Sequence, residues 1–142
     1  MNTVLLTNLI KIRWIAIAGQ LITLFITFFL FNFNIPLTEC LLVVISSVLI
    51  NFYSYFIQRA NSTLSDKKTF LFLLFDISQL VGLLFLTGGV FNPFVVLILA
   101  PIIISASYLS ALWTILLSLY SILLILIINF NYVPLNWEQN FI

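Results

Sequence analysis

The chain reads TGGVFNPF at residues 87–94, between two apolar runs, Phe70–Leu86 and Phe94–Leu109, of the length that crosses a bilayer. This stretch carries two glycines, an amide, a proline and two phenyl rings, and it carries no charge. Glycine ends helices because it tolerates a positive φ, asparagine is a good N-cap, and proline suits the first position of a helix. We therefore predict a tight turn that joins two membrane-spanning helices.

The composition places the chain in lipid. Of its 142 residues 63% are hydrophobic and 6% are charged, and the mean hydropathy is +1.27. A soluble domain is about a quarter charged. The net charge of +1 gives no argument for a nucleic-acid partner. Histidine is absent, there is one cysteine, and the four carboxylates lie far apart, so we expect no metal site and no catalytic residues here.

Apolar windows along the chain predict an all-α membrane protein with five spans. Residues 1–10 are short and mixed, and they suit an amphipathic turn in the plane of the interface. The predicted spans are Ile12–Phe31, Leu37–Ile57, Phe70–Leu86, Phe94–Leu109 and Leu112–Phe130.

The basic residues predict which side of the membrane each end of the chain occupies. All of them fall before or at the start of the first span, or between the second and third, a position that the positive-inside rule makes cytoplasmic. Trp14 and Trp113 fall at the same boundary, and Trp137 falls at the other. Five spans from a cytoplasmic N-terminus leave residue 142 outside, so a sensor that reports to the cytoplasm needs a sixth helix. The basic residues are Lys11, Arg13, Arg59, Lys67 and Lys68.

Asp76 is an ionisable residue inside the third predicted span. A carboxylate there costs about 2.5–3.5 kcal/mol on the insertion scale, and Gln79 shares its helix face, so we expect that face to turn inward. One interpretation is structural: a hydrogen bond between helices, or a carboxylate that reaches toward Lys67 and Lys68. The other is functional: a proton acceptor or the polar end of a ligand cavity.

The glycine turn also admits two interpretations. As a capped bend it satisfies its own backbone, and physical grounds alone favour this interpretation. As a ligand site, Gly88 and Gly89 let a planar ring approach the backbone, and Asn92 donates to a ring carbonyl. Phe91 and Phe94 then supply ring faces for stacking. Such a site binds a neutral, lipid-soluble ring and does not transform it.

Three stretches together resemble one known family. They are RWIAIAGQ at residues 13–20, the run from Asp76 to LTGGVFNPF at residues 86–94, and APIIISAS at residues 100–107. In order and spacing they are similar to the RegB/PrrB/ActS family of redox-sensing membrane histidine kinases. The similarity covers most of residues 11–137, and the GGxxNPF run is its most specific part.

The resemblance implies six membrane helices, then a cytoplasmic dimerisation domain with the phosphorylated histidine, then an ATP-binding domain. Quinone bound at the turn regulates autophosphorylation in that family. The resemblance further implies a homodimer in the bacterial inner membrane, in contact with lipid and quinone, with a response regulator as partner of the cytoplasmic domains. It assigns ubiquinone contact to Gly88, Gly89, Asn92, Pro93 and Phe94, with Asp76 as an accessory, and Phe91 joins them as a stacking ring.

The chain departs from the family pattern after the fifth span. Residues 1–142 contain no sixth helix, no phosphoacceptor histidine and no kinase domains, and Cys40 is not the counterpart of the family's redox-active cysteine. We therefore expect the quinone-binding sensor portion of a two-component histidine kinase, truncated before its dimerisation and ATP-binding domains. The alternatives are a small transporter or channel subunit that uses Asp76, or a truncated product without a signalling role.

Overall fold

The computed structural model describes residues 6–57, 64–134 and 136–137. Within these residues the predicted all-α class is confirmed, and the elements that were not predicted are short. A π-helix, η1 (Ile26–Leu30), extends the first helix, and two 3-10 helices, η2 (Gly89–Phe91) and η3 (Pro93–Ile98), follow the third. The α-helices are α1 (Leu6–Phe25), α2 (Leu37–Ile57), α3 (Asp66–Leu86), α4 (Leu99–Tyr108) and α5 (Ala111–Phe130).

Some of the predicted helix boundaries hold and others move. α2 has the predicted bounds, whereas α3 begins at Asp66, before the predicted start at Phe70, because the hydroxyl of Ser65 accepts a hydrogen bond from the backbone N–H of Lys68 at 3.4 Å. The expected interfacial turn within residues 1–10 is wrong for residues 6–10, which form the start of α1. Leu9 and Ile10 are buried in the core, and this packing keeps the helix continuous.

The helices are those of a multi-pass membrane protein. Four of them are long and apolar enough to cross a bilayer among the described residues: Thr7–Leu30, Leu37–Phe56, Asp66–Leu86 and Ala111–Phe130. The predicted fourth span is instead divided between η3 and α4, which together form the shorter apolar helix Pro93–Tyr108. Pro101 therefore lies in the first turn of α4, where proline is tolerated.

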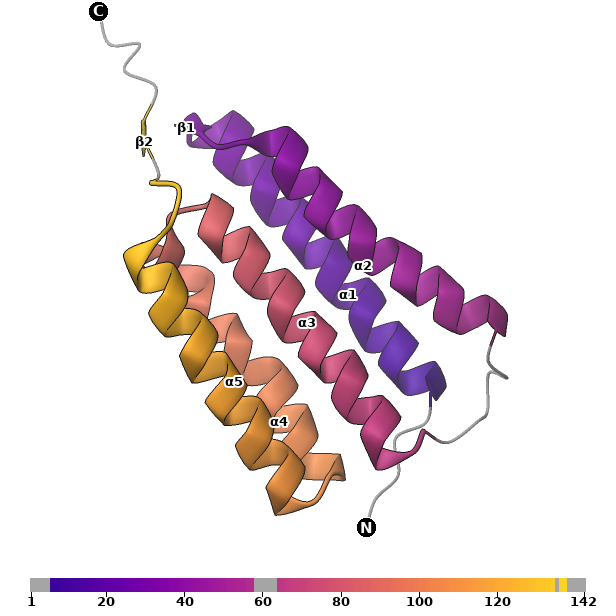
Figure 1. Cartoon of the computed structure of the whole chain (residues 1–142). Coiled ribbons are helices and arrows are strands. Elements are labelled where there is room, and N and C mark those ends of the chain that lie inside the picture. Colours follow the sequence, from indigo (N-terminus) through magenta and orange to yellow (C-terminus); the bar gives the residue numbers. More distant parts are fainter. Residues whose placement is uncertain (1–5, 58–63, 135, 138–142) are drawn as a thin grey trace, which may run out of the picture.

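Helix α3 lies between two groups of helices (Figure 1). On one side α1 and α2 pack against each other, and on the other side α4 and α5 pack against α3. Two separate hydrophobic clusters follow this division. One joins α3, α4 and α5 with the start of α1, and the other joins α1, α2 and the loop between them with Leu83 and Leu86 of α3.

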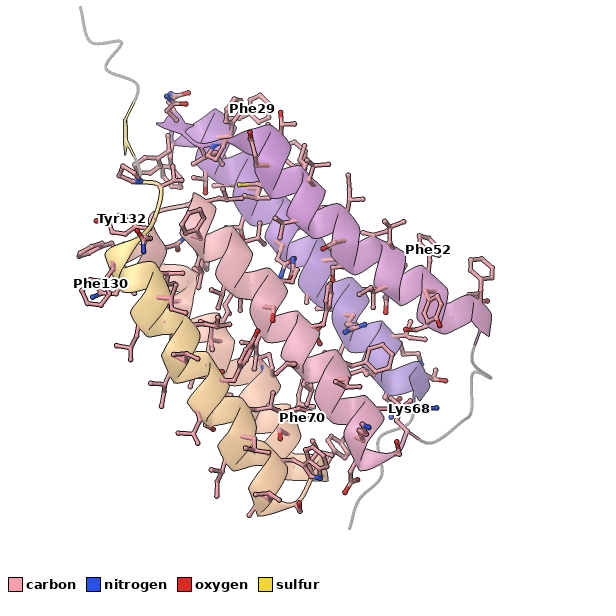
Figure 2. The ribbon with its side chains drawn as sticks, in the orientation of Figure 1. Phe29, Phe52, Lys68, Phe70, Phe130 and Tyr132 are labelled. Atoms are coloured by element: carbon pink, nitrogen blue, oxygen red, sulfur yellow. The ribbon has the colours of Figure 1, made fainter. Side chains whose placement is uncertain are left out.

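One end of the bundle gathers the positive charges that the sequence placed together. Lys11, Lys67 and Lys68 lie at the start of α1 and α3, and Figure 2 shows Lys68 at the end of the bundle opposite Tyr132. Trp113 packs on Phe70 at this end, with ring centroids 4.9 Å apart. Arg59 lies outside the described residues, and the cytoplasmic location of this end stays a prediction.

The opposite end is joined by a short antiparallel pair of strands that was not predicted. β1 (Phe33–Asn34) lies in the loop between α1 and α2, and it pairs with β2 (Asn136–Trp137), which follows α5. The segment after α5 therefore contacts the loop between α1 and α2 as well as the glycine turn described below.

Candidate ligand-binding site

The backbone of the turn has the conformation that its glycines predict. Gly88 has a φ of 101° and Gly89 a φ of 60°, both in the left-handed region that favours glycine. Asn92 caps η3 because its Oδ1 accepts the backbone N–H of Phe94 at 2.9 Å, and Pro93 occupies the first position of that helix. The predicted capping roles of Asn92 and Pro93 are confirmed.

Both polar atoms of the Asn92 amide bond within the turn. Its Nδ2 donates to the backbone oxygen of Thr87 at 3.0 Å and to the hydroxyl of Thr87 at 2.9 Å. That hydroxyl in turn donates to the backbone oxygen of Leu83 at 2.6 Å. A bond from Asn92 to a ligand carbonyl therefore replaces a bond to Thr87.

The open space that we expected beside the glycines is filled at Gly89. A Cβ atom built on Gly89 would lie 2.7 Å from the Cβ of Tyr132, which follows α5 (Figure 2). The backbone N–H of Gly88 donates to the oxygen of Val133 at 2.9 Å, and the N–H of Val133 donates to the oxygen of Phe85 at 2.8 Å. Because Gly89 has no side chain, Tyr132 of the same chain can pack against its backbone.

The two phenyl rings of the turn point to different places. Phe91 is 74% exposed and packs on the ring of Tyr132, with centroids 5.6 Å apart. Phe94 is 43% exposed and borders a cavity that opens on the surface of the bundle. The structure therefore does not bring these rings together around one site.

The cavity has a volume of about 340 Å³ and lies between α1, α3 and the η3–α4 segment. This is within the range of small-molecule sites, which begins at about 300 Å³. Its walls are mainly apolar side chains of α3 and of the η3–α4 segment: Leu80, Leu83, Leu84, Leu97, Ala100, Pro101 and Ile104. Among the predicted site residues, Asp76, Asn92 and Phe94 line it, whereas Gly88, Gly89, Phe91 and Pro93 do not.

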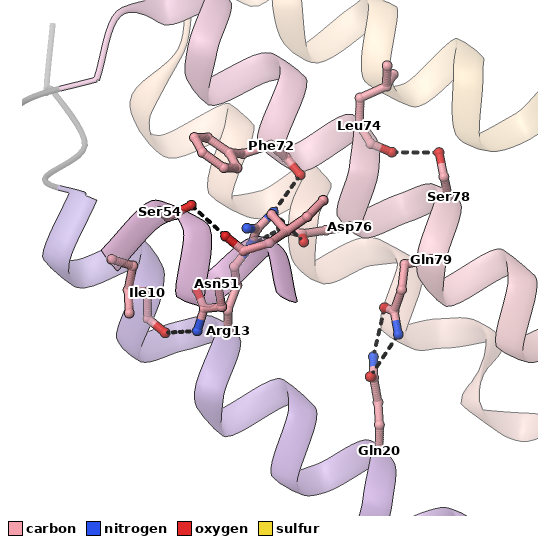
Figure 3. A network of polar contacts seen from close by, with 11 residues as sticks. Ile10, Arg13, Gln20, Asn51, Ser54, Phe72, Leu74, Asp76, Ser78 and Gln79 are labelled. Atoms are coloured by element: carbon pink, nitrogen blue, oxygen red, sulfur yellow. Dashed lines mark hydrogen bonds and ion pairs between the residues drawn. The ribbon is translucent and has the colours of Figure 1, made fainter. Parts of the chain in front are cut away.

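Asp76 forms an ion pair with Arg13 of α1 at one end of this cavity (Figure 3). Nη2 of Arg13 lies 2.7 Å from Oδ1 of Asp76, and Nε of Arg13 donates to Oδ2 at 3.3 Å. Nη2 also donates to the backbone oxygen of Phe72 at 3.1 Å, and the guanidinium lies over the ring of Phe72. Asp76 therefore joins two helices and does not reach toward Lys67 or Lys68.

Farther along the same two helices, Gln20 and Gln79 bond to each other (Figure 3). Each side-chain amide donates to the oxygen of the other, at 3.1 Å and 3.0 Å. The predicted inward orientation of the Asp76–Gln79 face is confirmed. The partners on α1 were missed, although Arg13 and Gln20 are seven residues apart, which places them on one helix face.

Two known proteins are similar to this chain, and both are described as "Sensor histidine kinase RegB" from Cereibacter sphaeroides. One is 38% identical over 130 residues, which are 92% of this chain and 28% of the relative. The other, from strain ATCC 17023, is 39% identical over 75 residues, which are 53% of this chain and 16% of the relative. The chain belongs to the RegB family.

This RegB-family chain spans less than a third of the length of the relatives that it matches. No protein-family model matches it, and no solved structure does. The first alignment covers most of the chain, so the family assignment includes the turn and the helices that enclose the cavity. The arrangement in this RegB-family membrane region suits binding: an apolar slot, a ring at its edge, and neutral or paired polar groups.

Proposed function

We propose that the chain is the quinone-binding transmembrane sensor portion of a redox-sensing, two-component histidine kinase. The ligand that this portion senses is ubiquinone, and the kinase and ATP-binding activities reside in the remainder of a longer protein. The relatives that carry the name of a sensor histidine kinase support the signalling role. The cavity between α1, α3 and the η3–α4 segment is the observation that carries the ligand role.

The proposal includes five crossings of the inner membrane, with the N-terminus in the cytoplasm. The η3–α4 segment is the short one, with six residues of 3-10 helix and ten of α-helix. A 3-10 helix rises about 2.0 Å per residue and an α-helix about 1.5 Å, so the segment is roughly 27 Å long. This nearly matches the hydrocarbon core of about 30 Å, and the 3-10 geometry supplies the extra length.

The chemistry of the cavity fits a quinone in three respects. Its wall is predominantly apolar, as a neutral ring with an isoprenoid tail requires. Phe94 offers an apolar ring face to the ligand at the end nearest the turn. Its polar groups are amides, hydroxyls and a charge-neutral ion pair, which bind carbonyl oxygens without reacting with them. A transport path through Asp76 has less support, because both of its carboxylate oxygens bond to Arg13.

Signalling follows from the position of the cavity between the two groups of helices. Most of the buried apolar residues of α1 belong to one hydrophobic cluster, while most of those of α3 and those of α4 belong to the other. A ligand between them shifts the equilibrium between a closer and a wider separation of the two groups of helices. The size of this shift equals the difference between the ligand's affinities for the two separations. Quinone and quinol differ in hydrogen bonding and so differ in that bias. The longer protein is proposed to act as a homodimer that passes this change to its kinase domains and response regulator.

The experiment is photolabelling of the purified chain in lipid nanodiscs with a photoreactive ubiquinone analogue. Phe94→Ala removes a ring from the cavity wall, and Phe91→Ala removes the same ring from an exposed site on the same turn. We expect labelling to fall about fivefold or more in Phe94→Ala and to stay at the wild-type level in Phe91→Ala. Labelling that excess unlabelled ubiquinone does not displace from the wild-type chain would contradict the proposed function.

A further inference from the structure

Two polar bridges cross the cavity between α1 and α3, and all four of their side chains line it: the Arg13–Asp76 ion pair and the Gln20–Gln79 amide pair. Polar side chains inside a membrane bundle are costly, and well-packed apolar residues often stabilise a helix interface as well or better. A structural role alone therefore gives little reason for two such bridges on the wall of one cavity.

The glutamine bridge keeps hydrogen-bonding capacity in reserve. A primary amide carries two N–H donors and an oxygen with two lone pairs, and the reciprocal bonds use one N–H and one lone pair of each glutamine. Within the described ranges, the second N–H of Gln20 and of Gln79 has no partner. Nη1 of Arg13 likewise has no partner in the described part of the chain, since its bonds run through Nε and Nη2.

The turn contrasts with this bridge. Both N–H groups of Asn92 are committed to Thr87. A ligand carbonyl at Asn92 would gain one hydrogen bond and break another, whereas a carbonyl at the glutamine pair would gain a bond without breaking one. A buried N–H without a partner gains stability when it finds an acceptor. The glutamine pair should therefore bind a ligand carbonyl more strongly than Asn92 does.

We propose that the Gln20–Gln79 pair, and not Asn92, donates the hydrogen bond that fixes a ring carbonyl of the bound quinone. This assignment rests on the proposed function and deepens it. Gln79 precedes Thr87, the residue that caps the end of α3, by eight positions, so the ring lies about 12 Å deeper than the glycine turn. The second carbonyl then faces the Arg13 end of the cavity, and the tail leaves past Phe94 at the turn.

The same pair accommodates the reduced ligand. A quinol hydroxyl both donates and accepts hydrogen bonds, and the remaining lone pair of either glutamine oxygen can accept the hydrogen bond that the hydroxyl donates. Arg13 can only donate, so it interacts better with a carbonyl than with a hydroxyl hydrogen. The ligand's redox state thus changes which groups of the two bridges are used.

The test measures ubiquinone with ¹³C-labelled carbonyls bound to the chain in nanodiscs, by equilibrium titration and by infrared spectroscopy of the carbonyl stretch. Gln79→Leu and Gln20→Leu each remove one half of the bridge. Ser78→Ala is the matched control, because Ser78 is adjacent to Gln79 but bonds to Tyr120 of α5 at 2.6 Å, away from the cavity. Thermal unfolding of each variant verifies that it is folded.

We expect the wild-type chain and Ser78→Ala to bind with one carbonyl band shifted to lower frequency. In each leucine variant that is folded, the shift is lost and binding is about fivefold weaker. If the wild-type chain binds ubiquinone and both leucine variants keep its affinity and its carbonyl frequency, the glutamine assignment is overturned and the proposed function stays intact. Absence of ubiquinone binding by the folded wild-type chain would overturn both.

Discussion

Arg13 of α1 and Asp76 of α3 form an ion pair with an N–O distance of 2.7 Å, 63 positions apart in the chain. The side chain of Arg13 is only 4% exposed and that of Asp76 is 20% exposed. Each residue alone would be a costly charge in an apolar bundle, and together they are neutral. The pair thus explains how two intramembrane charges are tolerated at the edge of a ligand cavity.

The ion pair predicts strong coupling between its two positions. Asp76→Leu leaves Arg13 buried and unpaired, so we expect the free energy of unfolding to fall by about 3 kcal/mol. The double variant Arg13→Met/Asp76→Leu removes both charges, and we expect it to regain most of that loss. Chemical unfolding of the wild type, Asp76→Leu, Arg13→Met and the double variant in detergent micelles gives the coupling energy. Additive losses in the double variant would show that the two residues act independently.

Gly89 is predicted to be irreplaceable for steric reasons. Gly89→Ala places a Cβ 2.7 Å from Tyr132 and also forces alanine into a positive φ, so we expect a loss of about 2 kcal/mol. Gly82→Ala is the matched control, since the nearest atom to its Cβ is 3.7 Å away, an ordinary contact. The measurement is the melting temperature of each variant. An equal, small change at both glycines would contradict the packing of Tyr132 on the turn.

Asn92 is predicted to act first as a cap. Asn92→Ala removes the acceptor for the N–H of Phe94 and both donors to Thr87, and we expect a loss of about 2 kcal/mol. Asn92→Ser keeps a capping oxygen, so its loss should be roughly half as large. Comparison of the two unfolding free energies checks this. A serine variant as unstable as the alanine variant would argue against the capping role.

The predicted number of crossings is tested by labelling single cysteines in intact and opened spheroplasts, in a Cys40→Ser background. Residues 67 and 110 should be labelled from the cytoplasm, and residue 91 from outside. Phe91 is a suitable site because it is 74% exposed. Residues 91 and 110 flank the η3–α4 segment, so labelling of both from the same side would show that this segment does not cross.

The sequence anticipated what local chemistry determines. The glycine conformations, the asparagine cap and the inward Asp76–Gln79 face all follow from residue type and spacing along one helix or turn. The partners on other helices did not follow. Arg13 fitted the positive-inside pattern so well that its position inside an apolar window was overlooked, although intramembrane charges usually pair.

The filling of the glycine turn was unpredictable for a different reason. Tyr132 and Val133 reach Gly88 and Gly89 only because α5 returns to that end of the bundle, a tertiary relationship that no spacing rule encodes. The division of the fourth predicted span into 3-10 and α-helix has a local cause in part, since Asn92 caps the start of η3 and Pro93 is its first residue. Its extent to Ile98 depends on packing against α3.

The central claim, that a flat lipid-soluble ligand occupies the cavity between α1 and α3, is tested most directly by filling that cavity. Gly19 lines the cavity, and a Cβ built on it meets no atom within 4 Å, so Gly19→Leu places its Cβ in open space and adds the rest of its side chain at the cavity wall. The measurement is the dissociation constant of ubiquinone for the purified chain in nanodiscs. We predict at least tenfold weaker binding by Gly19→Leu, with an unchanged melting temperature. Wild-type affinity in a folded Gly19→Leu variant would contradict the account.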